Sequence, residues 1–269
     1  MPLPPPSLFN TLPWASIQPH VDALLAAELT PATIAAWLKD WSDLRELIQE
    51  RGTLVSIANV QDTTDLAAEA AYKAYLNDIR PPAQQANNDL TQKLLASGLS
   101  VPGLEIPLRS LRTDAEIFRE ANLPLQTAEQ QNGISFNKIA GAQTIEWDGI
   151  EHTITGISPQ YEASPRDTRR AIFERIDARE EQDRPPINTL WREALGIRAQ
   201  IAANAGFPGD YRAYAWRARH RHDYTPPTAS PSTTPSSRPP SPPPGASTPN
   251  TRKSSGWKNS APGIWTSTN

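Results

Sequence analysis

The sequence predicts a mainly α-helical fold of antiparallel helical hairpins, with one β-hairpin and a disordered C-terminal tail. Apolar residues recur at helical spacing through much of residues 11–224. A stretch at about residues 143–155 instead alternates apolar and polar residues around Asp148-Gly149. From Thr225 onward there is no Asp or Glu, and most residues are Pro, Ser or Thr. We therefore expect a flexible arm at 1–10, a helical region at 11–224 and a disordered tail at 225–269.

Composition excludes several classes of protein. The 269 residues carry a net charge of −3, which gives no global field suited to nucleic acid or a membrane surface. There is no cysteine, so disulfides and thiolate metal sites are excluded. The first ten residues, MPLPPPSLFN, lack the basic and apolar regions of a secretion signal. No apolar run approaches the roughly 20 residues of a membrane span. We expect a soluble cytoplasmic protein that binds neither nucleic acid nor membrane.

The first part of the helical region contains two strong helix signals. Ser16–Leu29 is the first candidate, and Thr30-Pro31 then supplies an N-cap and a first helical proline. The helix after this signal carries an apolar stripe, in which we interpret Trp37 and Trp41 as core residues. Residues 53–60 (TLVSIANV) fit a strand or a helix, and we predict that the helix continues past Gly52.

Proline and glycine divide the next part of the chain. We predict a helix over Asp62–Asp78 that is ended by Pro81-Pro82, and another over Ala83–Ser97 with Gly98 as its C-terminal cap. A loop at residues 101–103 leads to two shorter helices, at 112–122 and 127–139.

After the predicted hairpin the chain returns to helices. Ser164-Pro165 begins a helix of mixed charge that runs to Asp183 and is interrupted by Pro185-Pro186. Residues 187–205 form a strong helix, and residues 210–224 a shorter one that is basic and aromatic.

The search for catalytic, cofactor-binding and metal-binding residues yields none. The H-E-x-x-H motif of zinc hydrolases, phosphate-binding glycine loops and the G-x-S-x-G elbow are all absent. We interpret His152 of the hairpin as an exposed or cross-strand side chain, because no second metal ligand is near it in sequence.

The nearest constellation to a site is RARHRHDY, residues 217–224. His220 and His222 are two residues apart, so on a helix they point in different directions. Three arginines and three aromatic residues nearby could suggest a nucleic-acid patch: Arg217, Arg219, Arg221, Tyr211, Tyr214 and Trp216. The balanced overall charge favours a solvated basic helix face instead.

Several stretches resemble the oligoendopeptidase F branch of the M3 zinc metallopeptidases. They are FNTLPW (9–14), DTTD (62–65), FREANLPL (118–125), KIAGAQTIEWDG (138–149), IAANAGFPGDYRAY (201–214) and HDYTP (222–226). They occur in the family's order, although none is a catalytic motif. The resemblance implies a helical N-terminal half that forms one wall of a deep substrate channel. In the family, H-E-x-x-H and a glutamate ligand come later, so no zinc or catalytic residue can be carried over.

The tail can be interpreted as a shifted reading frame. When the third base of each codon is joined to the first two bases of the next, Pro226–Ser237 can encode Ala-Asp-Cys-Ile-Ala-Phe-His-Asp-Ala-Ile-Glu, an amphipathic pattern. Residues 259–268 then give Leu-Arg-Pro-Trp-Asp-Leu-Asp-Val-Asp, in which Trp265-Thr266 forces one Asp. Both strings resemble the segment that comes after D-Y-T-P in the family. We hypothesise a one-base loss near codons 226 and 227; the alternative is a genuine disordered linker or docking tail.

These observations lead to two functional hypotheses. In the first, the chain is a truncated M3-type oligoendopeptidase whose intact form hydrolyses short peptides with zinc, while this chain holds no zinc and is inactive alone. Its natural packing partner is then the missing catalytic half. In the second, the chain is a non-enzymatic helical binding module with a disordered docking tail.

Overall fold

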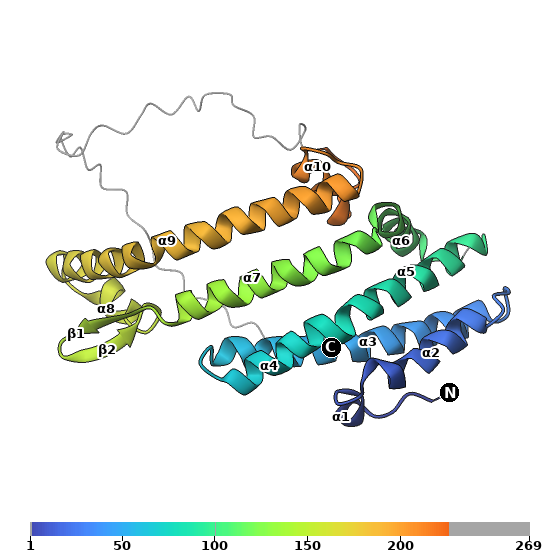
Figure 1. The fold of residues 1–269 in the computed structure, drawn as a ribbon, viewed down its shortest axis with the longest axis horizontal. Helices are drawn as coiled ribbons and strands as arrows, with labels where there is room; N and C mark the ends of the chain where they lie inside the picture. The colour runs from blue at the N-terminus through green and yellow to red at the C-terminus, as the bar shows by residue number, and fades with distance from the viewer. Residues whose placement is uncertain (1, 100, 226–269) are drawn as a thin grey trace, which may run out of the picture. The chain divides into compact units, whose positions relative to one another are not determined.

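The computed structural model describes residues 2–99 and 101–225 (Figure 1). The chain divides into two units, Met1–Ala229 and Ser230–Asn269, and the described residues all belong to the first. The predicted disorder of the tail concerns residues that lie outside the described ranges, apart from Thr225.

The described part is mainly α-helical with one two-stranded antiparallel sheet, as the sequence predicts. The helices before the sheet are α1 (Pro6–Phe9), α2 (Trp14–Ala26), α3 (Ile34–Gln61), α4 (Leu66–Ala74), α5 (Arg80–Ala96), α6 (Glu105–Ile117) and α7 (Leu123–Gly141). A π-helical turn, η1 (Tyr75–Ile79), joins α4 to α5, and a 3₁₀ turn, η2 (Glu120–Asn122), precedes α7. After strands β1 (Thr144–Trp147) and β2 (Ile150–Thr153) come α8 (Ser158–Ala163), α9 (Arg166–Asn204) and α10 (Tyr211–Ala218). None of these helices has the length and apolarity needed to cross a bilayer.

The larger core cluster draws its residues from α1, α2, α3, α5 and α6. Trp37 and Trp41 of α3 are 4% and 3% exposed, and their ring centroids are 5.2 Å apart. The Trp37 indole N–H donates to the carbonyl of Leu24 in α2 at 2.9 Å, so its polar atom is satisfied inside the core. The prediction that these tryptophans are core residues is confirmed, as is the continuation of α3 past Gly52.

The prediction of a flexible arm at residues 1–10 is wrong for Pro6–Phe9, which form α1. Proline fits at the start of a helix because the first N–H groups have no intrahelical partner. Phe9 is 0% exposed and belongs to the same core cluster as the two tryptophans. Burial of one aromatic side chain therefore ties the N-terminal segment to the core.

Pro81-Pro82 does not end the helical path, contrary to the prediction. The turn η1 widens the helix just before these prolines, and they then occupy the first turn of α5. A π-turn shifts the backbone hydrogen-bond register, so the two missing N–H groups fall where a new helix begins. The far end of α5 agrees with the prediction, with Gly98 in the left-handed region at φ 66°.

Helices α7 and α9 lie side by side and run antiparallel (Figure 1). Polar side-chain contacts at successive positions fix the register of α7 against α9. Arg198 Nε pairs with Glu129 Oε1 at 2.6 Å, and Asn132 Nδ2 donates to the carbonyl of Leu190 at 3.0 Å. This is the antiparallel helical pairing that the sequence predicts.

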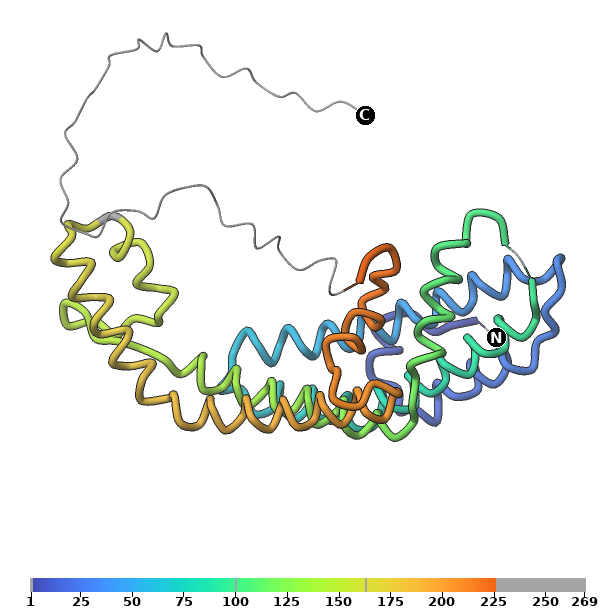
Figure 2. Tube along the Cα trace, turned by 90° about the horizontal axis from the view of Figure 1, so that it is seen from above, coloured from blue at the N-terminus to red at the C-terminus, as the bar shows by residue number. Residues whose placement is uncertain are grey.

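The predicted interruption at Pro185-Pro186 is also wrong, because both prolines lie inside the 39-residue helix α9. Figure 2 shows that the axis of α9 changes direction partway along its length. Bending is the response expected of a helix that loses two backbone donors and keeps its packing on both sides.

The predicted hairpin is confirmed. β1 and β2 pair antiparallel with Trp147 opposite Ile150, and the turn residues Asp148 and Gly149 have φ of 53° and 76°. Two successive left-handed residues are what a tight turn of this twist requires, and Asp-Gly tolerates them. Ile145 and Trp147 join a second, smaller core cluster that includes Ile172 of α9.

Several helix boundaries differ from the prediction, among them the start of α3, which is Ile34 with Thr33 as N-cap and not Pro31 with Thr30 as N-cap. The helix expected at 112–122 begins earlier and ends at Ile117, after which Phe118 and Arg119 are extended. The helix expected at 210–224 ends at Ala218, where His220 takes a left-handed φ of 52°. Side-chain contacts between residues 220–223 and α6 stabilise this ending.

Candidate functional site

A polar cleft of about 330 Å³ lies between α3, η1, α5 and α6. Its charged lining groups are Arg45 from α3, Arg80 from α5 and Asp114 from α6. Four carboxamide side chains and the phenol of Tyr75 also line it. The residues come from sequence positions that are far apart, so the cleft is a product of helix packing.

The charges of the cleft are not balanced. Asp114 Oδ1 lies 2.7 Å from His220 Nε2 and is already engaged. The guanidinium of Arg45 lies 5.8 Å from the Trp41 ring centroid. Arg80 Nη1 is buried, and no group within residues 2–99 and 101–225 accepts a hydrogen bond from it. The cleft therefore carries an excess of positive charge.

Tyr75 marks the closest approach of η1 to α3. Its hydroxyl donates to the carbonyl of Ile48 at 3.3 Å. A Cβ at Gly52 would lie 2.5 Å from the same hydroxyl oxygen, so glycine is what allows the two helices to meet here. Burial raises the pKa of Tyr75, while the nearby Arg80 and Arg51 oppose the rise.

His152 lies in β2 opposite Ile145 of β1, which places it as a cross-strand side chain. Across the described ranges, no three His, Asp or Glu side chains are grouped so that they could hold a metal ion. The described residues therefore do not fit the ligand set of a zinc site.

His220 and His222 stack on each other with ring centroids 5.9 Å apart. His220 is also paired with Asp114 of α6. Burial and the nearby Arg109 lower the pKa of His222, which disfavours its charged form. The His220 ring thus hydrogen-bonds the segment after α10 to α6, and the His222 ring packs against the His220 ring.

Of the three arginines expected on a solvated helix face, only Arg217 lies in α10, and Arg217 and Arg221 are half-buried. Arg217 forms an ion pair with Glu116 of α6. The guanidinium of Arg221 lies 4.5 Å from the Trp216 ring centroid, and the Trp216 indole donates to the carbonyl of Tyr224 at 2.7 Å. These contacts fold the chain back after α10 and attach it to α6.

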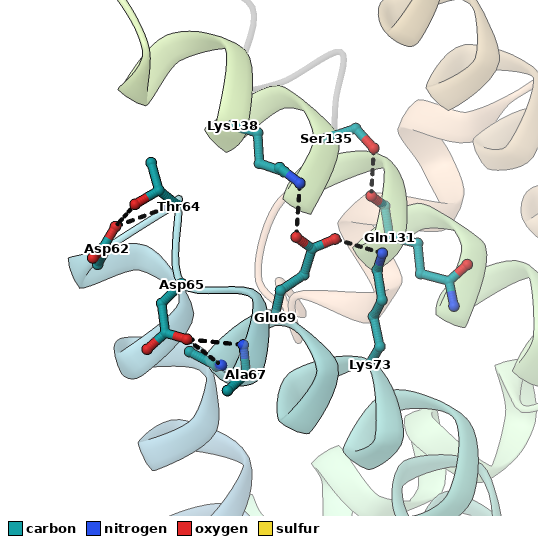
Figure 3. Close-up of polar contacts among 10 residues, drawn as sticks. Asp62, Thr64, Asp65, Ala67, Glu69, Lys73, Gln131, Ser135 and Lys138 are labelled. Atoms are coloured by element: carbon teal, nitrogen blue, oxygen red, sulfur yellow. Dashed lines mark hydrogen bonds and ion pairs between the residues drawn. The ribbon is translucent and has the colours of Figure 1, made fainter.

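A second charged cluster joins α4 to α7 (Figure 3). Glu69 is 9% exposed and accepts hydrogen bonds from Lys73 at 2.5 Å and Lys138 at 2.7 Å. The Lys138 and Lys73 hydrogen bonds hold the pKa of Glu69 at about 2. Both lysines are engaged by this one carboxylate, so we interpret the cluster as a structural tie between helices.

Four of the stretches that carry the family resemblance contact one another in two pairs. In DTTD, Asp62 accepts from the backbone N–H and hydroxyl of Thr64, and Asp65 caps α4 (Figure 3). A Cβ at Gly141 of KIAGA would lie 2.7 Å from the hydroxyl oxygen of Thr63 in DTTD. The two stretches therefore meet in a close contact between the turn before α4 and the end of α7.

A second pair of stretches meets at Asn122, which is 2% exposed. Its amide donates to the carbonyl of Ile201 at 3.1 Å, and its oxygen accepts from Asn204 at 2.8 Å. FREANLPL and IAANAGFPGDYRAY are thus joined through a buried amide network between η2 and α9.

Comparisons with known proteins agree with this picture. Residues 13–100 match the family model described as Peptidase M3 N-terminal domain. No curated protein matches the chain.

Solved structures share the fold. A protein described as an oligoendopeptidase F from Bacillus anthracis superposes with a TM-score of 0.69 at 16% identity, covering 79% of this chain and 40% of its own. A second structure described as an oligoendopeptidase F gives a TM-score of 0.71 at 19% identity, with 83% and 39% covered. PZ peptidase A, solved with an inhibitor, gives 0.71 at 16% identity, with the same coverage of 83% and 39%.

This chain spans about two fifths of the length of those proteins. The family match and the shared fold confirm the resemblance seen in the sequence. Residues 13–100 therefore match the N-terminal domain of the M3 peptidase family, and the chain shares the fold of the oligoendopeptidase F structures.

Proposed function

We propose that this chain is the scaffold half of an M3-type oligoendopeptidase that hydrolyses short peptides when intact, and that the chain is inactive alone. The observation that carries the proposal is the M3 N-terminal domain match, together with a fold that covers about two fifths of each related structure. The chain contains no H-E-x-x-H motif. In the intact enzyme, zinc held by the catalytic half would activate water for peptide hydrolysis.

Exposed apolar side chains on two helices support the proposal that these helices pack against the catalytic half. On α9, Trp191 is 57% exposed and Leu195, one turn later, is 48% exposed. Leu54, Ile57 and Val60 recur every three residues along α3 and are 49%, 49% and 54% exposed. Rows of apolar groups this open usually mark a contact surface. We assign them to the interface with the catalytic half.

The interface can be tested by binding. The catalytic half of an M3 oligoendopeptidase should form a complex with this chain, and Trp191→Ser should weaken that complex by about tenfold or more because an aromatic anchor is lost. Arg192→Ser removes the adjacent exposed side chain of α9 and serves as the matched control. Equal weakening by both variants, or no complex at all, would contradict the assignment.

We also propose that residues 226–269 are encoded out of frame through a one-base loss near codons 226 and 227. Resequencing the gene across this point tests the proposal directly. A restored frame should continue with the amphipathic pattern that the shifted frame encodes. An intact frame through this region would instead support a genuine Pro/Ser/Thr-rich tail and the alternative function of a helical binding module.

A further inference from the structure

The cleft between α3, η1, α5 and α6 has cationic groups that the described chain does not neutralise. Arg80 is half-buried, and no described carboxylate pairs with it. Arg45 is exposed, and its guanidinium lies 5.8 Å from the centroid of the Trp41 ring. Asp114, the one acidic lining residue, is engaged by His220. A guanidinium removed from water without a counter-charge is costly, which favours an anionic ligand at this place.

The other groups that line the cleft indicate which hydrogen-bonding groups an anionic ligand must carry. Asn87 and Asn88 each have a buried carboxamide oxygen without a hydrogen-bond donor. Gln84 donates to Gln126 at 2.8 Å and is already used. A ligand that satisfies Arg80 and the two asparagines must therefore offer acceptors and N–H donors together. Anions such as chloride and sulfate offer acceptors only, whereas the C-terminal end of a peptide offers a carboxylate and amide N–H groups together.

The cleft also has an apolar side. Ile48 of α3, Ala83 of α5 and Phe118 after α6 line it alongside the polar groups. Its volume of about 330 Å³ is at the small end of ligand pockets, which suits one or two residues of a peptide. Charge, amide chemistry and size thus point to one class of ligand.

We propose that this cleft binds the C-terminal carboxylate of a short peptide. Arg80 and Arg45 supply the counter-charge, and Asn87 and Asn88 contact the adjoining peptide group. Charge-assisted bonds to guanidinium groups are the strong part of such a contact. The choice of a peptide, rather than another carboxylate, rests on the proposed function, while binding at the cleft is a property of this chain alone.

The test is titration calorimetry on the full chain without any catalytic half. Acetyl-trialanine with a free carboxylate should bind, and the same peptide with a C-terminal amide should bind about tenfold more weakly or worse. Arg80→Gln should weaken binding of the free acid by about tenfold or more and leave the weak binding of the amide unchanged. Arg192→Gln, which removes the same charge from the exposed face of α9, should have no effect.

Three results would overturn the proposal. They are equal binding of the acid and the amide, unchanged binding by Arg80→Gln, and binding of inorganic phosphate as tight as that of the peptide. The last would make the cleft a general anion site. If Arg80→Gln does not fold, as judged by circular dichroism, Arg45→Gln provides the same comparison. Because no cleavage is measured, failure of the peptidase proposal and failure of this one give different results.

Discussion

Replacing Phe9 with alanine tests whether the N-terminal segment is part of the core. Phe9 is 0% exposed, although it lies in a helix of only four residues that comes after a proline run. A flexible arm would tolerate the change, whereas a core residue would not.

The magnitude follows from the burial. Removing a fully buried phenylalanine costs its transfer free energy plus the cavity left behind, which together amount to about 3–5 kcal/mol. For an unfolding m-value of about 2 kcal/mol per molar urea, the midpoint should fall by about 1.5–2.5 M. The neighbouring Leu8 is 51% exposed, so Leu8→Ala should cost less than about 1 kcal/mol.

Urea unfolding followed by tryptophan fluorescence measures both variants, because Trp37 and Trp41 belong to the same cluster as Phe9. If Phe9→Ala has no folded baseline, Phe9→Leu keeps most of the apolar volume and gives a graded loss. Midpoints that are equal for Phe9→Ala and Leu8→Ala would refute the reasoning.

Four further predictions concern single residues of the helices. The pKa of Glu69 falls from 4.5 to about 2 on folding, so its ion pairs stabilise the fold above pH 4.5 and lose that effect as the pH falls toward 2. Glu69→Gln should flatten the pH dependence of the thermal midpoint in this range. Gly196→Ala should stabilise α9 by about 0.5–1 kcal/mol, because no atom lies within 4 Å of the added Cβ. Gly52→Ala should destabilise instead, because its Cβ would displace Tyr75; urea midpoints compare the two. Asn122→Leu should cost about 1–3 kcal/mol, measured in the same way, because the buried bond to the Ile201 carbonyl is lost and the half-buried Asn204 amide loses its acceptor.

Local signals predicted the parts of the fold that depend on local chemistry. Asp148-Gly149 specifies a tight turn by its own backbone preferences, and the hairpin is present. The apolar spacing around Trp37 and Trp41 predicts a buried helix face, and both residues are buried. In each case neighbours in sequence decide the outcome.

The predictions that were wrong concern places where contacts between distant segments decide the structure. Pro81-Pro82 and Pro185-Pro186 were expected to end helices, but packing on both sides keeps the chain helical, through a π-turn in one case and a bend in the other. Phe9 is ordered by contacts with α3, which no local pattern reveals.

The candidate cleft could not be predicted for the same reason. Arg45 and Arg80 are ordinary basic residues in sequence, and only the packing of α3 against α5 and α6 brings them to one cavity. Asn122 and Asn204 likewise show no signal of pairing until α9 passes the start of α7. Sequence similarity did identify the stretches involved, although it could not say which of them touch.

The most direct test of the account is complementation of peptidase activity. This chain should be mixed with the catalytic half of an M3 oligoendopeptidase, and hydrolysis of a quenched fluorescent peptide should be monitored with and without a zinc chelator. The donor enzyme's own N-terminal half serves as the positive control. The account predicts no cleavage by this chain alone and chelator-sensitive cleavage by the mixture. Cleavage by the chain alone, or a mixture that stays inactive while the positive control recovers, would contradict it.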